Sequence, residues 1–348
     1  MADPSPAERI IVQDEIIRKR LGRITHKILV LSGKGGVGKS TVAVNLAASL
    51  ALAGHRTGLL DVDIHGPSIP TMLGIEGARA EAREGAIIPV EAAGMKLISL
   101  GFFTDSSDDA VIWRGPLKAG LIRQFMSDVE WGELDYLVVD SPPGTGDEPL
   151  SVCQLMGPVD GAVVVTTPQR VAAVDVRKCI SFCRKLGVRV LGVIENMSGF
   201  ACPKCGEVTH IFMSGGGAKM ARDMEVPFLG ALPLDPLVAE SCDSGRPFIY
   251  HYSKTPTARI MSGILAGITE PGSEKPDENA DSEENTEGSS SMKIAVPTSG
   301  GRLCAHFGHC DSFAVIEVDR AKGLILSKTD LQAPPHEPGL LPRWLAKE

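Results

Sequence analysis

A phosphate-binding loop is indicated by the stretch Gly33–Ser40, which reads GKGGVGKS. The frame G-x4-G-K-S follows an apolar run, Ile28–Leu31, and precedes a helical run, Thr41–Leu52, as such a loop requires. Glycines let backbone N–H groups surround phosphate oxygens, and the N-terminus of the following helix adds positive potential. Lys39 is expected to contact the β- and γ-phosphates of a nucleotide, and Ser40 to ligate Mg²⁺. The residues expected to surround the nucleotide are Gly33, Lys34, Gly35, Gly36, Val37, Gly38, Lys39, Ser40 and Thr41.

Two further segments place acidic side chains after apolar strands. Asp61 and Asp63 end the run TGLLDVD, and in a doubly wound sheet this strand end lies beside the phosphate loop. The run LVVDSPPGTGDE places Asp140 at the end of another apolar strand, where its carboxylate would hold Mg²⁺ through water. We therefore expect Lys39, Asp63 and Asp140 to act in phosphoryl transfer. The proline-stiffened loop Pro142–Asp147 is expected to be ordered by ATP and released on hydrolysis.

An adenine pocket is suggested by polar residues at two later strand ends. Asn196 follows a core strand, and its amide could bind the adenine edge. Pro233 and Asp235 follow the next strand and could complete the pocket. Each signal is weak alone, because Asn and Asp are also common turn-forming residues.

A cysteine pair, Cys202 and Cys205 in the run FACPKCG, lies on a loop after the strand that ends near Asn196. Two thiolates at this spacing bind one side of a metal ion or cluster, whereas a complete zinc or Fe–S site needs four ligands. The residues leave open a zinc half-site, a redox-active dithiol and an iron–sulfur site. Four other cysteines stand in apolar, helix-like contexts typical of buried small side chains: Cys153, Cys179, Cys183 and Cys242.

The composition limits the classes of protein. The 348 residues are 43% hydrophobic, enough for one large domain and a smaller unit. The net charge of −8 argues against general nucleic-acid binding. No apolar run is long enough to span a membrane, and residues 1–26 suggest an amphipathic helix rather than a signal peptide. Eight cysteines without a secretion signal favour a cytoplasmic protein with thiol or metal chemistry.

The strand pattern predicts an α/β fold, a doubly wound and mostly parallel sheet of the P-loop NTPase type, over residues 27–269. Near-continuous apolar strands separated by helices are typical of parallel sheets that are covered on both faces. One segment, Gly85–Leu100, instead suggests a hairpin. The expected strands are Lys27–Leu31, Thr57–Val62, Leu97–Leu100, Tyr136–Val139, Gly161–Thr166, Val188–Glu195 and Phe228–Leu232.

An acidic linker is expected at residues 270–291, which contain eight acids and one lysine. Such a segment cannot bury enough apolar surface to order itself. A short α/β unit follows at residues 292–348, with expected strands at Lys293–Pro297 and Ser312–Val318. It is small for an independent domain.

Lys34 narrows the class of nucleotide site, because a lysine directly after the first glycine resembles the deviant Walker A motif of signature-lysine ATPases. This resemblance implies that Lys34 reaches the phosphates bound by the neighbouring subunit, as a further catalytic group, so that ATP is enclosed within a dimer. A plain solvated loop lysine is the alternative.

Taken together, residues 26–268 resemble the Mrp/Nbp35/ApbC branch of this class, which consists of cytoplasmic iron–sulfur cluster carriers. The resemblance implies a homodimer that binds ATP and Mg²⁺, hydrolyses ATP slowly, and holds a [4Fe–4S] cluster through Cys202 and Cys205 of each subunit for transfer to apoproteins. From the net charge and the lack of a long apolar run, we expect no nucleic-acid or membrane partner. The motifs that carry the resemblance are SGKGGVGKST at Ser32–Thr41, DVDIHGPSIP at Asp61–Pro70, WRGP at Trp113–Pro116, VVDSPPGTGDE at Val138–Glu148, ENMSGF at Glu195–Phe200 and CPKCG at Cys202–Gly206.

The C-terminal unit resembles the start of the iron–molybdenum cofactor-binding domain of NifX-like proteins and NifB, of which it would be a truncated copy. MKIAVPTSGG at Met292–Gly301, AHFGHC at Ala305–Cys310 and PPHEPGLLPRWL at Pro334–Leu345 carry this resemblance. Ligand-type side chains gather in seven residues: Cys304, His306, His309 and Cys310.

Three alternatives remain at this stage. A MinD/ParA-like spatial regulator would need a basic or amphipathic C-terminal segment, whereas this chain has an acidic linker. A reductase like the nitrogenase iron protein would not place its ligands as a C-x2-C pair. The third alternative is an ATPase with structural zinc on that pair.

Overall fold

A computed structural model describes residues 6–63, 66–83, 85–103, 115–201, 208–269, 291–299, 302–303, 311–319 and 324–332. The chain divides into two compact units, Met1–Lys275 and Pro276–Glu348. Each is described by itself below.

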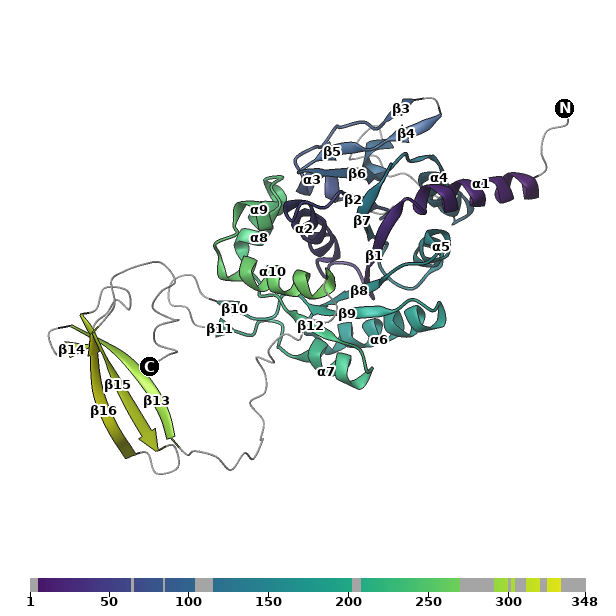
Figure 1. The fold of residues 1–348 in the computed structure, drawn as a ribbon. Helices are drawn as coiled ribbons and strands as arrows, with labels where there is room; N and C mark the ends of the chain where they lie inside the picture. The colour runs from purple at the N-terminus through teal and green to yellow at the C-terminus, as the bar shows by residue number, and fades with distance from the viewer. Residues whose placement is uncertain are drawn as a thin grey trace. The chain divides into compact units, whose positions relative to one another are not determined.

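The first unit is built on an eight-stranded sheet, as far as the described residues extend (Figure 1). All neighbours in it pair in parallel except β5, which pairs antiparallel with β6 at one edge. In spatial order the strands are β12 (Phe228–Ala231), β9 (Val190–Glu195), β8 (Gly161–Thr166), β1 (Ile24–Ser32), β7 (Leu134–Asp140), β2 (Thr57–Asp61), β6 (Met95–Ser99) and β5 (Val90–Ala92).

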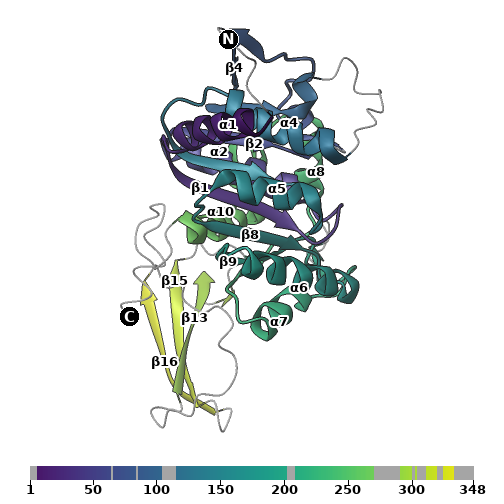
Figure 2. The same cartoon turned by 90° about the vertical axis from the view of Figure 1, so that its right-hand side faces the viewer.

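Helices cover both faces of this sheet (Figures 1 and 2). Successive residues of β1 point to opposite faces, so Leu29 and Leu31 join one buried cluster while Ile28 and Val30 join the other. The first cluster contains residues of α1 (Pro6–Leu21), α4 (Gly115–Asp128), α5 (Asp147–Met156), α6 (Arg170–Lys185) and α7 (Gly216–Asp223). The second contains residues of α2 (Lys39–Leu52), α3 (Ile69–Met72), α9 (Phe248–His251) and α10 (Pro256–Thr269), with α8 (Pro236–Asp243) packed beside α9.

The predicted α/β class is therefore confirmed, and most strands lie within a few residues of their expected bounds. β8 is buried along its whole length, as its run GAVVVT predicts. The expected hairpin exists as β5 and β6, while β4 (Ala86–Ile88) pairs with β3 (Glu81–Arg83) instead. A 3-10 helix, η1 (Leu100–Phe103), follows β6.

The N-terminal helix packs as part of this unit. α1 contacts α4 and α5, and it buries Ile17 and Leu21 in the same cluster as the sheet. β1 starts at Ile24, three residues before the expected start at Lys27. Within the described residues, no helix has both the length and the apolar character needed to cross a membrane.

The second unit contains an antiparallel sheet in the order β14-β13-β15-β16. β13 (Ser291–Ser299) and β15 (Ser312–Asp319) contain the two expected strands, and Phe313 and Ala314 are buried. β14 (Arg302–Leu303) and β16 (Leu324–Gln332) were not expected. The ligand-type residues Cys304, His306, His309 and Cys310 lie outside the described residues.

Candidate functional site

The phosphate loop joins β1 to α2 at the carboxyl edge of the sheet. Gly36 and Gly38 adopt φ angles of +75° and +83°, which favour glycine. Gly33 and Gly38 also allow close packing: a Cβ on Gly33 would lie 2.4 Å from the backbone carbon of Asp175, and a Cβ on Gly38 would lie 2.2 Å from Asn196 Nδ2. A Cβ on Gly35 or Gly36 would meet nothing within 4 Å. The loop is thus packed on one side and open on the other.

A cavity of about 250 Å³ lies on that open side. It is lined by seven of the nine predicted loop residues, all except Gly33 and Val37, and by Asp63. Five further lining residues were not among the predicted nucleotide contacts, although Pro143 belongs to the loop that was expected to be ordered by ATP: Ser32, Gly66, Ser68, Met72 and Pro143. A glycine-rich cavity at a helix N-terminus is suited to bind phosphate groups.

The predicted Mg²⁺ ligands lie side by side. Ser40 Oγ donates a hydrogen bond to Asp140 Oδ2 at 2.5 Å, and Lys39 Nζ donates to Asp140 Oδ1 at 2.7 Å. Burial raises the pKa of Asp140, and the Lys39 ammonium opposes that shift. A hydroxyl and a carboxylate are the hard oxygen donors that Mg²⁺ prefers, so the residues present fit the ion.

The two aspartates at and just after the end of β2 have different surroundings. Asp61 is fully buried and accepts hydrogen bonds from Ser99 Oγ at 2.8 Å and from the backbone N–H of Asp63 at 3.1 Å. Burial, together with the charge of Asp140, raises the pKa of Asp61 to about 8. Asp63 instead faces the cavity, with Oδ2 3.7 Å from Lys39 Nζ. Asp63 is therefore the carboxylate with access to a bound nucleotide.

Lys34 is half-buried in the same cavity. Its Nζ donates to Gln169 Oε1 at 3.5 Å, and its carbonyl accepts from Ser32 Oγ at 2.9 Å. Gln169 is the N-cap residue of α6. Lys34 therefore lines the cavity of its own subunit. That its ammonium contacts the phosphates bound by a neighbouring subunit stays a prediction.

The loop after β7 is tied to the phosphate loop. The backbone N–H of Gly144 donates to the carbonyl of Ser32 at 2.8 Å, and that of Ser141 donates to Val30 at 3.2 Å. Gly144 has a φ of +91°, and Pro143 lines the cavity. A movement of the loop after β7 would therefore shift the start of the phosphate loop.

Asn196 contacts the phosphate loop directly. Its Nδ2 donates to the carbonyl of Val37 at 2.9 Å, and its Oδ1 accepts from the backbone N–H of Met197 at 3.0 Å. Asp235 caps α8, accepting from the N–H of Leu237 at 2.9 Å, and its second oxygen accepts from Thr257 Oγ1 at 2.6 Å. These contacts serve the protein itself, and the adenine contacts expected of Asn196, Pro233 and Asp235 stay predictions.

The cysteine pair falls, in the sequence, between the two strands of a small hairpin, called the cysteine hairpin below. β10 (Phe200–Ala201) and β11 (Val208–Thr209) pair antiparallel, and Cys202 and Cys205 lie between them in the chain, outside the described residues. The described residues contain no group of three or more His, Cys, Asp or Glu side chains placed to hold a metal ion. The sequence analysis did not select Glu195, whose carboxylate accepts hydrogen bonds from residues before and after the hairpin in the chain. The one sequence feature that could have indicated it is its position directly before Asn196 at the end of a strand.

Three of the four cysteines expected to be buried small side chains are buried. Cys153, Cys179 and Cys183 are buried in the core, and Cys242 is half-buried, 3.8 Å from Thr41 Oγ1. Burial raises the pKa of the Cys153 thiol to about 12, which keeps it protonated and unreactive.

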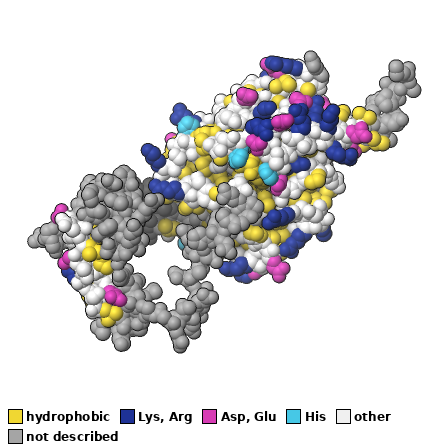
Figure 3. Space-filling view, viewed as in Figure 1, with side chains coloured by type: hydrophobic (Ala, Val, Ile, Leu, Met, Phe, Trp, Pro, Cys, Tyr) yellow, Lys and Arg dark blue, Asp and Glu magenta, His cyan; other side chains and the backbone are white. Residues whose placement is uncertain are grey.

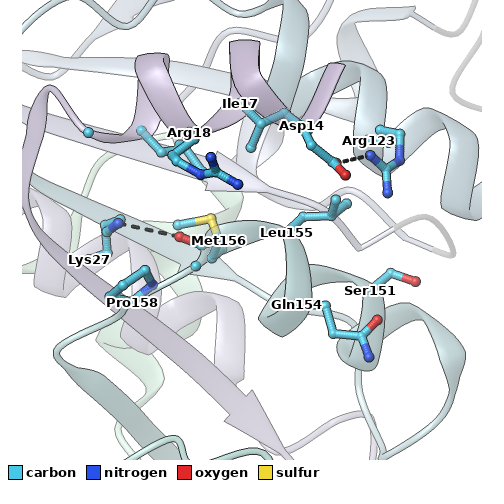
Figure 4. Close-up of a pocket in the computed structure, with 13 residues that line it drawn as sticks. Asp14, Ile17, Arg18, Lys27, Arg123, Ser151, Gln154, Leu155, Met156 and Pro158 are labelled. Carbon is cyan, nitrogen blue, oxygen red and sulfur yellow. Dashed lines mark hydrogen bonds and ion pairs between the residues drawn. The ribbon is translucent and has the colours of Figure 1, made fainter. Parts of the chain in front are cut away.

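A larger cavity, of about 720 Å³, lies between α1, α4 and α5 (Figure 4). Arg123 pairs there with Asp14, and the buried Lys27 donates to the carbonyl of Met156 at 3.3 Å. Burial lowers the pKa of Lys27. This cavity has no glycine-rich loop and no hydroxyl–carboxylate pair, so chemistry rather than size identifies the nucleotide site.

Residues 23–269 match the family model ParA, described as "NUBPL iron-transfer P-loop NTPase". Residues 290–348 match the model described as "Dinitrogenase iron-molybdenum cofactor", which confirms the predicted resemblance of the C-terminal unit. The iron–sulfur cluster carrier protein of Methanocaldococcus jannaschii is 50% identical over 247 residues, covering 71% of this chain and 85% of the relative. The cytosolic Fe–S cluster assembly factor NUBP2 of Gallus gallus is 48% identical over 265 residues, covering 73% and 97%.

A solved structure of similar fold, a nucleotide-binding protein from Archaeoglobus fulgidus in complex with ADP, is 41% identical with a TM-score of 0.61. It covers 71% of this chain and 95% of that chain. The cell-division ATPase MinD of Pyrococcus furiosus shares the fold at 23% identity and a TM-score of 0.51, covering 70% and 98%. The phosphate loop, the paired Ser40 and Asp140, and these matches agree: the chain belongs to the ParA family of NUBPL-type iron-transfer P-loop NTPases.

Proposed function

We propose that this protein is an ATP-dependent carrier of iron–sulfur clusters, acting in the cytoplasm. ATP would occupy the cavity at the phosphate loop, with Lys39 at the β- and γ-phosphates, and Mg²⁺ would be held by Ser40 and, through water, by Asp140. Mg²⁺ would neutralise charge on the phosphates during hydrolysis. Asn196, Pro233 and Asp235 are the proposed neighbours of the adenine base.

Hydrolysis requires a positioned water and stabilisation of negative charge at the phosphate. Asp63 faces the cavity close to Lys39, so it is the proposed group that orients the attacking water. Lys34 would add positive charge at the phosphates of the neighbouring subunit, so that hydrolysis requires a homodimer. Because hydrolysis would time cluster handling, we expect it to be slow.

The cluster is the cargo of this cycle. A [4Fe–4S] cluster would be held by Cys202 and Cys205 of each of two subunits, since one pair supplies half of a four-thiolate site. Recipients would be apoproteins that need such a cluster. The names of the two 48–50% identical relatives support this cargo and its transfer.

The observation that carries the proposal is a hydrogen bond between the phosphate loop and the end of β9, the strand that precedes the cysteine pair in the chain. The Asn196 amide donates to the Val37 carbonyl within the phosphate loop, and β10, which leads to Cys202, begins four residues later at Phe200. A change at the nucleotide therefore has a short covalent path to the cysteine hairpin. If nucleotide changes cluster affinity, the cluster must change nucleotide affinity by the same factor.

The test is anaerobic reconstitution with iron and sulfide, counting iron per dimer for the wild type and for the double variant Cys202→Ser/Cys205→Ser. We expect about four irons per dimer in the wild type and loss of them in the variant. Little iron, or tightly bound zinc that resists replacement, would contradict the carrier function and favour a structural metal site.

A spatial regulator of the MinD/ParA kind, acting at a membrane or on DNA, is the second candidate, because the cell-division ATPase MinD has the same fold. On the face drawn in Figure 3, the coloured Lys and Arg side chains of the described residues are interspersed with Asp and Glu. Mixed charge of this kind gives a weak field for a polyanion. Binding of DNA or liposomes in an ATP-dependent pull-down would favour the regulator instead.

A further inference from the structure

One buried carboxylate next to the proposed nucleotide site has no role in phosphate chemistry. Glu195, the last residue of β9, has no exposed surface. Its Oε1 accepts hydrogen bonds from Ser198 Oγ at 2.6 Å and from the backbone N–H of Gly215 at 3.0 Å, and its Oε2 accepts from the N–H of Gly217 at 2.5 Å. Among the described residues it forms no ion pair with a Lys or Arg, so these three donors stabilise its charge.

The three donors lie on both sides of the cysteine hairpin in the sequence. Ser198 comes just before β10, while Gly215 and Gly217 begin α7, beyond β11. The two backbone N–H groups stand at the N-terminus of α7, where the helix dipole favours a negative charge. One carboxylate therefore closes the segment 198–215 at its base.

The approach of α7 to this carboxylate depends on glycine. A Cβ on Gly217 would lie 3.0 Å from Glu195 Oε2 and 3.1 Å from Glu195 Cβ, closer than ordinary van der Waals contact. The same base is also tied to the next strand end, because the N–H of Ser198 donates to Leu232 at 2.8 Å and the N–H of Leu234 donates to Gly199 at 2.8 Å.

The neighbouring residue connects this base to the nucleotide site. Asn196 holds the Val37 carbonyl in the phosphate loop, and its backbone N–H donates to the Thr166 carbonyl at 2.7 Å. Two consecutive side chains at the end of β9 therefore contact the phosphate loop and the base of the hairpin. A shift of the phosphate loop that moves Asn196 also moves Glu195, because a peptide bond joins them.

We propose that Glu195 is a positioning residue that fixes the cysteine hairpin relative to the phosphate loop, and so makes cluster retention respond to nucleotide. The proposal rests on the proposed function for its cluster readout. Its structural half, that the carboxylate orders the segment 198–215, is independent of any metal and is tested separately.

The first experiment measures amide hydrogen exchange of the segment 198–215 in the metal-free full chain. In Glu195→Gln an amide NH₂ replaces one acceptor and faces an N–H donor, so we expect faster exchange in this segment with little change in β8. Ser198→Ala should give a smaller increase, and Ser198→Thr, which keeps the hydroxyl, should restore protection. Ser127→Ala is the matched control, since Ser127 is a buried serine of α4 whose Oγ donates to Gln124. Unchanged exchange in Glu195→Gln would overturn the proposal, whether or not the wild type binds iron.

The second experiment measures iron release from the reconstituted dimer to a chelator, with ATP and with ADP. Loss of a hydrogen bond to a charged group corresponds to roughly tenfold or more in an equilibrium, so we expect release from Glu195→Gln to be about tenfold faster than from the wild type. We also expect the difference between ATP and ADP to disappear, while nucleotide affinity stays within about threefold. If Glu195→Gln keeps the wild-type release rates and their nucleotide dependence, the inference fails while the carrier function stands. A wild type that binds no iron contradicts the carrier function alone.

Discussion

Gly38 offers a sharp test of how the phosphate loop is built, because its replacement by alanine has two separate costs. The φ of Gly38 is +83°, and an L-residue in the left-handed region costs roughly 1–2 kcal/mol. The new Cβ would also lie 2.2 Å from Asn196 Nδ2, so the Asn196 side chain must move and lose its hydrogen bond to Val37, at a cost of about 1 kcal/mol. Together, Gly38→Ala should lower the free energy of unfolding by about 2–3 kcal/mol.

Urea unfolding of the nucleotide-free protein measures this loss, and Gly35→Ala is the matched control in the same loop. A Cβ on Gly35 meets nothing within 4 Å, and its φ is not in the left-handed region, so this variant should be neutral or slightly more stable, by up to about 1 kcal/mol. If the two variants unfold at the same urea concentration, neither the positive φ of Gly38 nor its contact with Asn196 contributes measurably to the free energy of unfolding.

Three further predictions follow from the buried groups and from the proposed dimer. Burial raises the pKa of Asp61 from 3.8 to about 8, so the contribution of its protonated form to stability is complete below about pH 4 and is lost as pH rises through about 8. The free energy of unfolding should therefore fall over this pH range, as measured by urea unfolding at each pH. Asp61→Asn should make this fall smaller. Lys34→Ala should abolish ATP-dependent dimerisation in analytical ultracentrifugation while ATP binding to the monomer weakens less than about tenfold; an unchanged dimer would contradict the proposed role of Lys34. Trp131 is buried, and its Nε1 has no hydrogen-bond partner among the residues that the structure describes. Trp131→Phe should therefore cost under about 1.5 kcal/mol in thermal unfolding, whereas a cost above about 3 kcal/mol would mean that the indole N–H contributes to stability.

The parallel sheet could be predicted because its strands are buried on both faces. A run such as GAVVVT in β8 has no polar face, and only a strand covered on both sides requires that composition. The second unit was harder to predict. β16 reads LILSKTDLQ, which does not alternate between apolar and polar residues, and residues 325–330 of this strand are exposed in the structure. A strand defined mainly by its pairing with β15 leaves little trace in hydrophobicity.

The nucleotide site was predictable where one motif contains all its parts, and less so where distant segments meet. Ser40 and Asp140 are 100 residues apart, yet both were expected at one site, because the loop and the strand end that contain them each have a recognisable sequence, and the two side chains are hydrogen-bonded. The difference between Asp61 and Asp63 could not be read from the sequence, because it depends on which carboxylate Ser99 contacts at the end of β6. Alternation along a strand places the two on the same face, but it does not say that β2 ends between them.

The end of β9 brings these observations together. Parallel strands of one sheet end at the same edge, so the phosphate loop after β1, Asp140 at the end of β7 and the hairpin after β9 lie at one edge although they are far apart in the chain. Two adjacent residues form contacts at this edge. Asn196 donates a hydrogen bond to the Val37 carbonyl, and Glu195 accepts hydrogen bonds from Ser198 and from the start of α7. In the proposed function, a hydrolysis cycle that shifts the phosphate loop would need no long relay to reach the segment that contains Cys202 and Cys205. It would need only that Glu195 and Asn196 keep their hydrogen-bond partners.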